Sequence, residues 1–270
     1  MLLIVVSLFH GLVLRRYTVT SDKLPDDTIV RIAVIADLHS HIRGDDQQPL
    51  LNMIAAQKPD LIAVVGDIVD DREPMEGAQL FLERVTDIAP TYYVSGNHEY
   101  WSNEYDSVIR PMIEACGITV IANERINITA NGIKLCLCGV DDPFVFDYTD
   151  DLELLALGNE QTLLRDRFSD LDDSTYNILL AHRPELIEDY QQYDFDLVLS
   201  GHTHGGQVRI PLLVNGLWAP DQDWFPEYGG GQYDFDGQTM IVSRGCGVEV
   251  KLPRVFNPPE VVLVDIEGKA

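Results

Sequence analysis

Leu61-Ile62-Ala63-Val64-Val65-Gly66-Asp67 is a short apolar run that ends in a glycine and an aspartate. A continuous run of this kind, rich in β-branched side chains, predicts a strand that is buried on both faces. Gly66 allows the backbone to turn sharply where the strand ends. Asp67 then has two uses that remain open: a ligand shared by two metal ions, or the cap of a following helix. The stretch predicts an α/β fold with a polar side chain at a strand end.

The same arrangement is repeated on both sides of this stretch. The apolar run 29–36 ends at Asp37, and the run 91–95 is followed closely by Asn97. The positions of Asp37 and Asp67 differ by 30, as do those of Asp67 and Asn97, and this is about the length of one βαβ unit. Successive units bring the carboxyl ends of parallel strands to one edge of a sheet, where ligands bind in open α/β folds. These polar side chains are therefore expected to converge.

Other segments complete the α/β pattern. Apolar runs predict further strands at 118–122, 133–139, 176–181, 197–200, 238–243 and 260–266. Helical spacing of apolar residues predicts helices at 49–57, 75–88, 103–116, 152–168 and 184–190. Neither an internal repeat nor a low-complexity linker interrupts the chain, so residues 17–270 are expected to form one domain.

Histidines are concentrated in the motifs that follow these runs. Asp37-Leu38-His39 places two side chains on the same side of a strand end, although such a pair on its own is more often incidental than metal-binding. Gly96-Asn97-His98-Glu99 is more specific. The Asn97 amide offers a neutral oxygen ligand. The adjacent His98 is a candidate general acid, because histidine as a residue type has an unperturbed pKa near neutrality.

The strongest single motif is Gly201-His202-Thr203-His204-Gly205-Gly206. Two histidines that are separated by a single residue and flanked by glycines in a turn are poorly explained as side chains that merely pack in the core. His182 ends another apolar run, 178–181. Alone it would be interpreted as a hydrogen-bonded core histidine, but together with the other motifs it is interpreted as a metal ligand.

The ordered set Asp-x-His, Gly-Asp, Gly-Asn-His-Glu, His and Gly-His-Thr-His resembles the calcineurin-like metallophosphoesterase superfamily, over nearly all of residues 31–266. Tyr228-Gly229-Gly230-Gly231 and Ser243-Arg244-Gly245, which follow the last motif, resemble one bacterial branch in particular. That branch contains phosphodiesterases that are often membrane-anchored, including enzymes that cleave the pyrophosphate of UDP-2,3-diacylglucosamine.

The resemblance implies a four-layer α/β/β/α sandwich, in which two mixed β-sheets are flanked by helices, and it makes residues 17–270 a catalytic domain. It also implies a role for each motif residue. One divalent metal ion would be bound by Asp37, His39 and His204, and a second by Asn97, His182 and His202. Asp67 would bridge the two ions. His98 would be the general acid and would bind neither ion.

The implied activity is the hydrolysis of a phosphodiester, with a hydroxide that bridges the metal ions as nucleophile and His98 protonating the leaving oxygen. Nitrogen and oxygen ligands without a thiolate suit Mn, Fe, Zn or Mg and do not choose among them. One alternative is a pyrophosphohydrolase that acts on a lipid-linked nucleotide-sugar such as UDP-2,3-diacylglucosamine. A second alternative is a scaffold that kept the fold without catalysis. The expected partner is a small-molecule or lipid-linked phosphate ester.

Charge and cysteine content exclude several other classes of protein. The chain has 270 residues and a net charge of −25. A field of this sign repels nucleic acid, so no nucleic acid polymer is expected as a partner. The four cysteines include no Cys-x-x-Cys pair, which argues against a zinc ribbon or a thioredoxin motif. Cys136 and Cys138 are expected to be small side chains of the core.

Two apolar segments leave the localisation open between membrane-associated and cytoplasmic. Residues 1–16 are apolar up to Arg15-Arg16, but a spanning helix needs roughly 20 apolar residues. The segment is a truncated membrane anchor, a helix in the membrane interface, or a buried segment. Residues 211–233 are either a packed cover or a lip for an apolar substrate or a membrane surface. Arg183 and Arg244 are expected in surface ion pairs, with phosphate binding as the alternative.

Overall fold

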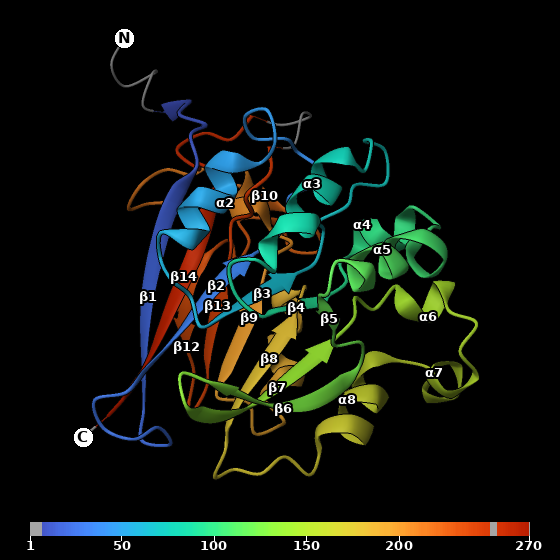
Figure 1. The fold of residues 1–270 in the computed structure, drawn as a ribbon, viewed down its shortest axis with the longest axis vertical. Helices are drawn as coiled ribbons and strands as arrows, with labels where there is room; N and C mark the ends of the chain where they lie inside the picture. The colour runs from blue at the N-terminus through green and yellow to red at the C-terminus, as the bar shows by residue number, and fades with distance from the viewer. Residues whose placement is uncertain (1–6, 249–252, 270) are drawn as a thin grey trace.

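Two six-stranded β-sheets face each other in the computed structural model, which describes residues 7–248 and 253–269 (Figure 1). The first sheet has the strand order β1-β14-β2-β3-β4-β5. Its strands are β1 (Val13–Ser21), β2 (Ile29–Ile35), β3 (Leu61–Val65), β4 (Thr91–Val94), β5 (Thr119–Val120) and β14 (Glu260–Gly268).

The second sheet has the strand order β12-β13-β9-β8-β7-β6. Its strands are β6 (Glu124–Ala130), β7 (Ile133–Val140), β8 (Tyr176–Ala181), β9 (Leu197–Ser200), β12 (Gly231–Asp234) and β13 (Thr239–Val242). A separate ribbon pairs β10 (Trp218–Ala219) with β11 (Asp223–Trp224).

Both sheets are mixed, and each contains a parallel core. Strands β2, β3, β4 and β5 are parallel to one another, as are β7, β8, β9 and β13. Antiparallel pairs occur between β14 and β2, between β6 and β7, and between β12 and β13. The parallel pairs bring the carboxyl ends of several strands to the same end of each sheet, as the spacing of the motifs predicts.

The alternation of side chains along each strand divides the core into layers. In β2, Val30, Ile32 and Val34 pack between the two sheets, whereas Ala33 and Ile35 face the helices outside the first sheet. All five side chains are fully buried, which explains why residues 32–36 are all apolar on both faces. Arg31, near the start of β2, is only partly buried and pairs with Asp265.

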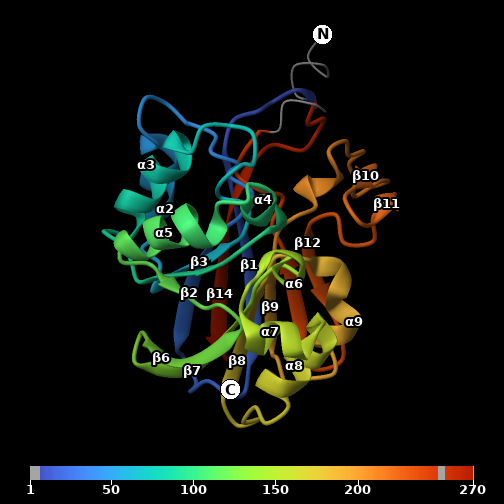
Figure 2. The same ribbon diagram turned by 90° about the vertical axis from the view of Figure 1, so that its right-hand side faces the viewer.

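Helices cover the outer face of each sheet (Figures 1 and 2). Apolar residues of α2 (Gln48–Ala55), α3 (Glu76–Val85) and α5 (Arg110–Ala115) pack on the first sheet. Those of α8 (Glu160–Phe168) and α9 (Ile187–Tyr190) pack on the second. The shorter helical segments are α4 (Asn97–Trp101), η1 (Tyr105–Ile109), α6 (Val145–Tyr148), α7 (Leu152–Leu157), η2 (Pro184–Leu186) and η3 (His204–Gly206). The predicted four-layer α/β/β/α sandwich is confirmed.

Three predicted helices are each divided in two. The segment 184–190 consists of η2, a 3₁₀ turn, followed by α9. The segment 103–116 contains η1, a π-helical turn, followed by α5. The segment 152–168 is broken at Gly158, whose φ of 77° ends α7 in the left-handed region, and Asn159 then caps α8 through its side chain.

Strands β1, β6 and β12 are absent from the predicted set. Each of them lies at the edge of a sheet, where one side of the strand lacks a partner and polar side chains remain exposed. Because β6 carries exposed residues along most of its length, it does not form the continuous apolar run that predicts a central strand. Cys136 and Cys138 are buried on the outer face of β7, as predicted.

The N-terminal segment joins the first sheet earlier than the sequence suggests. Strand β1 begins at Val13 and pairs in parallel with β14 along nine residues. The predicted boundary between residues 16 and 17 therefore falls inside a strand, and residues 13–16 belong to the folded domain. Residues 1–6 of the predicted segment lie outside the described residues. Across 7–248 and 253–269, none of the helices has the length and apolar character that crossing a bilayer requires.

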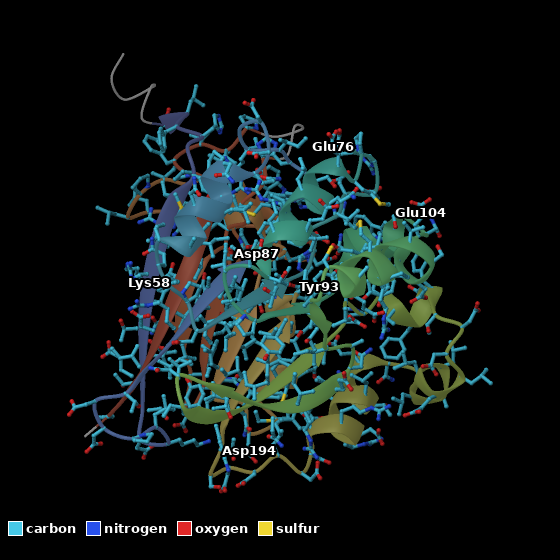
Figure 3. The ribbon with its side chains drawn as sticks, in the orientation of Figure 1. Lys58, Glu76, Asp87, Tyr93, Glu104 and Asp194 are labelled. Carbon is cyan, nitrogen blue, oxygen red and sulfur yellow. The ribbon has the colours of Figure 1, made fainter. Side chains whose placement is uncertain are left out.

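Exposed acidic side chains occur in separate parts of the fold. Glu76 and Glu104 are exposed in the upper part of the view in Figure 3, and Asp194 is exposed at the opposite end. The net charge of −25 is therefore carried mainly by a solvated surface, and it surrounds the molecule with a negative field.

Candidate metal centre

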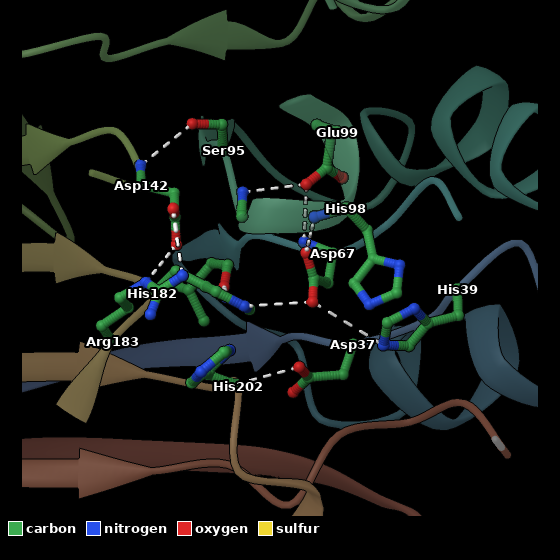
Figure 4. Close-up of polar contacts among 12 residues, drawn as sticks. Asp37, His39, Asp67, Ser95, His98, Glu99, Asp142, His182, Arg183 and His202 are labelled. Carbon is green, nitrogen blue, oxygen red and sulfur yellow. Dashed lines mark hydrogen bonds and ion pairs between the residues drawn. The ribbon is translucent and has the colours of Figure 1, made fainter. Parts of the chain in front are cut away.

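The motif residues meet where the carboxyl ends of strands from both sheets come together (Figure 4). Asp37, Asp67 and Asn97 follow β2, β3 and β4 of the first sheet. His182 and His202 follow β8 and β9 of the second. The structure thus brings together every residue that the sequence predicted as a ligand. These residues are Asp37, His39, Asp67, Asn97, His182, His202 and His204, and all are buried.

Asp37, His39 and His204 form one compact group of potential ligands. The Nε2 atoms of His39 and His204 are 3.2 Å apart, and the two rings are stacked with centroids 4.9 Å apart. Nε2 of His204 is 3.9 Å from Oδ1 of Asp37. This is the set that the resemblance assigned to the first ion.

Asp67, His182 and His202 form a second group. Oδ2 of Asp67 is 3.1 Å from Nε2 of His182 and 3.8 Å from Nε2 of His39, a member of the first group. One carboxylate oxygen therefore lies between the two groups, which is the position that a bridging ligand requires. The rings of His182 and His202 have centroids 5.0 Å apart.

Several atoms of these groups and of the neighbouring Asn97 are buried without a hydrogen-bond partner among the described residues: Asp37 Oδ2, Asp67 Oδ2, Asn97 Oδ1 and His182 Nε2. Burying such atoms unpaired costs free energy. Nδ1 of His182 donates to the backbone carbonyl of Val65, 2.7 Å away, so Nε2 of a neutral ring presents a lone pair to the Asp67 carboxylate. Two lone pairs 3.1 Å apart need a cation or a proton between them. The donor set of nitrogen and oxygen atoms fits a divalent metal ion.

The backbone is held in a rare conformation at most of these positions. Values of φ lie between 47° and 69° at Asp37, His39, Asp67, His202 and His204, in the left-handed region that non-glycine residues seldom occupy. Such strain is maintained where the surrounding structure enforces it, and it is typical of functional sites.

Carboxylates of the site raise the pKa of two of its histidines. Burial disfavours a charged imidazole, but Asp70 and Asp67 raise the pKa of His39 to about 9. Asp67 likewise raises the pKa of His182 to about 10. Burial alone would raise the pKa of Asp67, yet the neighbouring imidazoles lower it well below its usual range. Metal ions that bind here must displace the protons of these imidazoles.

Further carboxylates hold the site residues in place. Glu99 accepts hydrogen bonds from the backbone N–H groups of Gly96, Asp67, Ile68 and Val69, at 2.7–3.0 Å. It thereby joins the loop after β3 to the loop after β4. Asp70 accepts from Nδ1 of His39 at 3.1 Å. These contacts fix the orientation of the ligands, as carboxylates around metal sites commonly do.

His98 lies beside the two groups and is less buried than they are. Its Nδ1 is 2.7 Å from Oδ1 of Asp71, and its backbone N–H donates to Oδ1 of Asp67 at 2.9 Å. Its ring meets that of His39 edge to face. His98 lines a cavity of about 280 Å³, together with Asn97 and with four members of the two groups, His39, Asp67, His202 and His204.

Sequence reasoning missed four carboxylates of the site: Asp70, Asp71, Glu99 and Asp221. Asp70 and Asp71 lie three and four residues after Asp67, and Glu99 lies inside the motif Gly96-Asn97-His98-Glu99, so the sequence carried a signal for these positions. Asp221 lies in the irregular segment 211–233 and had none.

Arg183 and Arg244 are buried, whereas the sequence predicted that they would lie on the surface. They are 8% and 7% exposed, respectively, and each is paired with a buried carboxylate, Asp142 for Arg183 and Glu260 for Arg244. A buried guanidinium requires such a partner, which the sequence places far away along the chain.

Comparison with known proteins agrees with the fold and the site. The family model of the calcineurin-like phosphoesterases matches residues 30–206. An uncharacterized metallophosphoesterase of Aquifex aeolicus is 30% identical over 266 residues, which cover 94% of this chain and 91% of that protein. An uncharacterized metallophosphoesterase of Campylobacter jejuni is 28% identical over 249 residues, and the match spans 60% of its length.

Among solved structures, a phosphopantetheinyl hydrolase from Mycobacterium tuberculosis has a similar fold. The TM-score is 0.50 with 13% sequence identity, and the match covers 83% of this chain and 90% of that one. At this identity the likeness concerns the fold alone.

The fold and the ligand groups define a metal-dependent phosphoesterase. The chain belongs to the calcineurin-like phosphoesterase family, because the family model matches more than half of it.

Proposed function

We propose that this protein is a phosphodiesterase with two divalent metal ions. The observation that supports this most directly is the position of the Asp67 carboxylate, 3.1 Å from His182 and 3.8 Å from His39. In this proposal Asp37, His39 and His204 hold one ion. Asn97, His182 and His202 hold the other, and Asp67 is shared. When bound, two such ions supply positive charge that clamps the phosphate oxygens and acidifies a water molecule.

His98 is proposed to donate a proton to the leaving oxygen. Asp71 holds Nδ1 of the ring, so Nε2 is the nitrogen left for proton transfer in the cavity. A positioned acid of this kind contributes about 10²–10⁴-fold to the rate.

The charge of the cavity rim favours a diester over a monoester. Asp70, Asp71 and Glu73 line the cavity beside the ligand groups, and Arg72, which pairs with Asp71, offsets only one of these charges. A phosphomonoester carries close to two negative charges near pH 7, whereas a diester carries one, so repulsion by these carboxylates is weaker for the diester. Trp101 and Trp218 also line the cavity and offer apolar surface to the groups that the phosphate joins.

The experiment compares hydrolysis of bis-p-nitrophenyl phosphate and p-nitrophenyl phosphate by protein with a measured metal content. We expect a higher kcat/KM for the diester. Asp67→Asn is expected to weaken the binding of both ions and to abolish turnover. His98→Asn should retain the ions and lose about 10²–10⁴-fold in rate on an unactivated dialkyl diester, and less on a p-nitrophenyl ester. Stoichiometric metal without turnover of any phosphate ester would instead support a non-catalytic scaffold.

A second candidate substrate is a lipid-linked pyrophosphate such as UDP-2,3-diacylglucosamine. Segment 211–233 supports it because Leu212, Leu213, Trp224 and Phe225 are strongly exposed. An apolar cavity of about 290 Å³ is lined in part by this segment and shares Trp218 with the metal cavity. An acyl chain could therefore lie next to a phosphate held at the ligand groups.

Flotation with vesicles of zwitterionic phosphatidylcholine tests this candidate, because such vesicles do not repel the negatively charged protein. Replacing Leu212 and Leu213 by serine should reduce binding to the vesicles and slow hydrolysis of the lipid-linked pyrophosphate. Leu152→Ser on α7 is the matched control, since Leu152 and Leu213 are equally exposed, at 81%. Equal vesicle binding by parent and double variant would contradict the candidate.

A further inference from the structure

Asp221, in segment 211–233, reaches one of the candidate ligands from outside the motif loops. Its Oδ2 is 3.1 Å from Nε2 of His202, and the same oxygen pairs with Nη1 of Arg183. Glu185 is farther away, with Oε1 3.8 Å from His202 Nε2. The carboxylate of Asp221 therefore connects a histidine of the metal centre to a neighbouring arginine.

Arg183 gives Asp221 a fixed point of attachment. Its Nε donates to Oδ2 of the buried Asp142 at 2.6 Å, and Nη2 lies 3.3 Å from the other oxygen of that carboxylate. The guanidinium carbon also lies 5.4 Å from the centre of the Phe144 ring. Because these contacts hold one side of the guanidinium, Nη1 is directed toward Asp221.

The hydrogen bond to Asp221 determines which nitrogen of His202 can bind a cation. A carboxylate only accepts hydrogen bonds, so Nε2 of His202 carries a proton in this contact. A neutral imidazole then has its lone pair on Nδ1. His202 also belongs to the compact group with Asp67 and His182, where a metal ligand must present a lone pair.

We propose that Asp221 is a positioning residue that holds His202 with Nε2 protonated and Nδ1 directed to the second cation. The proposal rests on the proposed function, in which His202 is a ligand of that ion. Trp218 and Pro220, which line the metal cavity, lie within three residues of Asp221. Segment 211–233 therefore contacts the metal centre through Asp221 and also forms part of the wall of the substrate cavity.

The test is a calorimetric titration of metal-free protein with Mn²⁺. The parent is expected to bind two ions per chain. Asp221→Ala is expected to weaken one of the two binding steps by about 10- to 100-fold, the usual effect of removing a carboxylate that orients a ligand, and to leave the other unchanged. Asp221→Glu, which keeps a carboxylate, should recover part of the loss.

Asp223→Ala is the matched control, because it removes the same charge from the same segment at an exposed position on β11. Asp221 and Asp223 both lie in the left-handed region, with φ of 56° and 55°, so the backbone strain of an alanine is matched in the two variants, and a thermal unfolding curve of each metal-free variant confirms that it is folded. In addition, ¹⁵N NMR of the Zn²⁺-loaded parent should show a proton on Nε2 of His202.

The outcomes separate this proposal from the proposed function. If the parent binds fewer than two ions, the proposed function fails. If the parent binds two ions and Asp221→Ala binds both with unchanged affinity, the positioning role alone is overturned. An equal loss in Asp223→Ala would also overturn it, since the effect would then come from charge and not from the contact with His202.

Discussion

Gly96 shows how tightly the residues of the metal centre are packed. Its backbone is extended, with φ of −114°, a conformation open to any residue, so the reason for glycine is close approach. A Cβ atom at this position would lie 2.3 Å from Oδ1 and 2.6 Å from the backbone nitrogen of Asp67. A side chain at residue 96 would therefore displace the carboxylate that lies between the two ligand groups.

Gly96→Ala is expected to weaken cation binding and to reduce phosphodiester hydrolysis by about 10²-fold, because misplacing a reacting group by about 1 Å has an effect of that size. Calorimetry and initial rates measure the two losses. Gly117→Ala is the control. There φ is 78° and nothing lies within 4 Å of the added Cβ, so the variant should lose stability and keep activity. Parental activity in Gly96→Ala would contradict the explanation.

At the scale of the elements, helices α8 and α9 meet next to Arg183 and enclose an acidic side chain. Glu160 is the first residue of α8 and is 9% exposed. The hydroxyl of Tyr190, the last residue of α9, lies 3.3 Å from its Oε1. Burial, with a smaller contribution from Asp142, raises the pKa of Glu160 from 4.5 to about 8.

This shift predicts a pH dependence of stability. Between pH 4.5 and about 8 the folded protein keeps the proton on Glu160 and the unfolded chain does not. The folded state thus binds more protons, and this residue lowers stability as the pH rises through that range. Glu160→Gln removes this effect. The free energy of unfolding of the variant, relative to that of the parent, should therefore increase from pH 4.5 to about 8 and remain constant at higher pH.

Urea unfolding at a series of pH values measures this difference. Glu104→Gln, at an exposed position, should follow the parent at every pH. A constant difference between Glu160→Gln and the parent would show that Glu160 is ionised throughout.

The elements also show which parts of the fold the sequence can reveal. Central strands such as β3 and β8 were predicted with their observed ends, because burial on both faces leaves a continuous apolar run. Edge strands such as β1 were missed, since their exposed residues interrupt that pattern. The convergence of the candidate ligands at strand ends could be predicted because motif spacing and parallel topology place these residues together. Asp221 was missed because its contact with His202 depends on the path of an irregular segment.

For the molecule as a whole, the surface charge and the site act on a substrate at different ranges. The net charge of −25 repels an anionic diester at a distance, whereas bound cations attract it at contact, where salt screens much less. Raising the salt concentration from about 10 mM to about 200 mM shortens the Debye length severalfold and weakens mainly the long-range repulsion.

We therefore expect kcat/KM for bis-p-nitrophenyl phosphate to rise with salt concentration. A zwitterionic diester, p-nitrophenylphosphocholine, should show a smaller rise because its net charge is zero. Steady-state rates with both substrates across a KCl series give the comparison. A fall in kcat/KM for the anionic diester would mean that attraction by the site dominates the approach of the substrate.

The candidate ligands come from both sheets, since Asp37, Asp67 and Asn97 follow strands of the first sheet and His182 and His202 follow strands of the second. A pair of cations bound between them would cross-link the two halves of the sandwich. Chelation would then do more than stop turnover. Each cation present at 100 times its Kd adds about 2.7 kcal/mol to the free energy of unfolding, so the chelated protein should melt at a lower temperature, with the seam between the sheets opening first to hydrogen exchange.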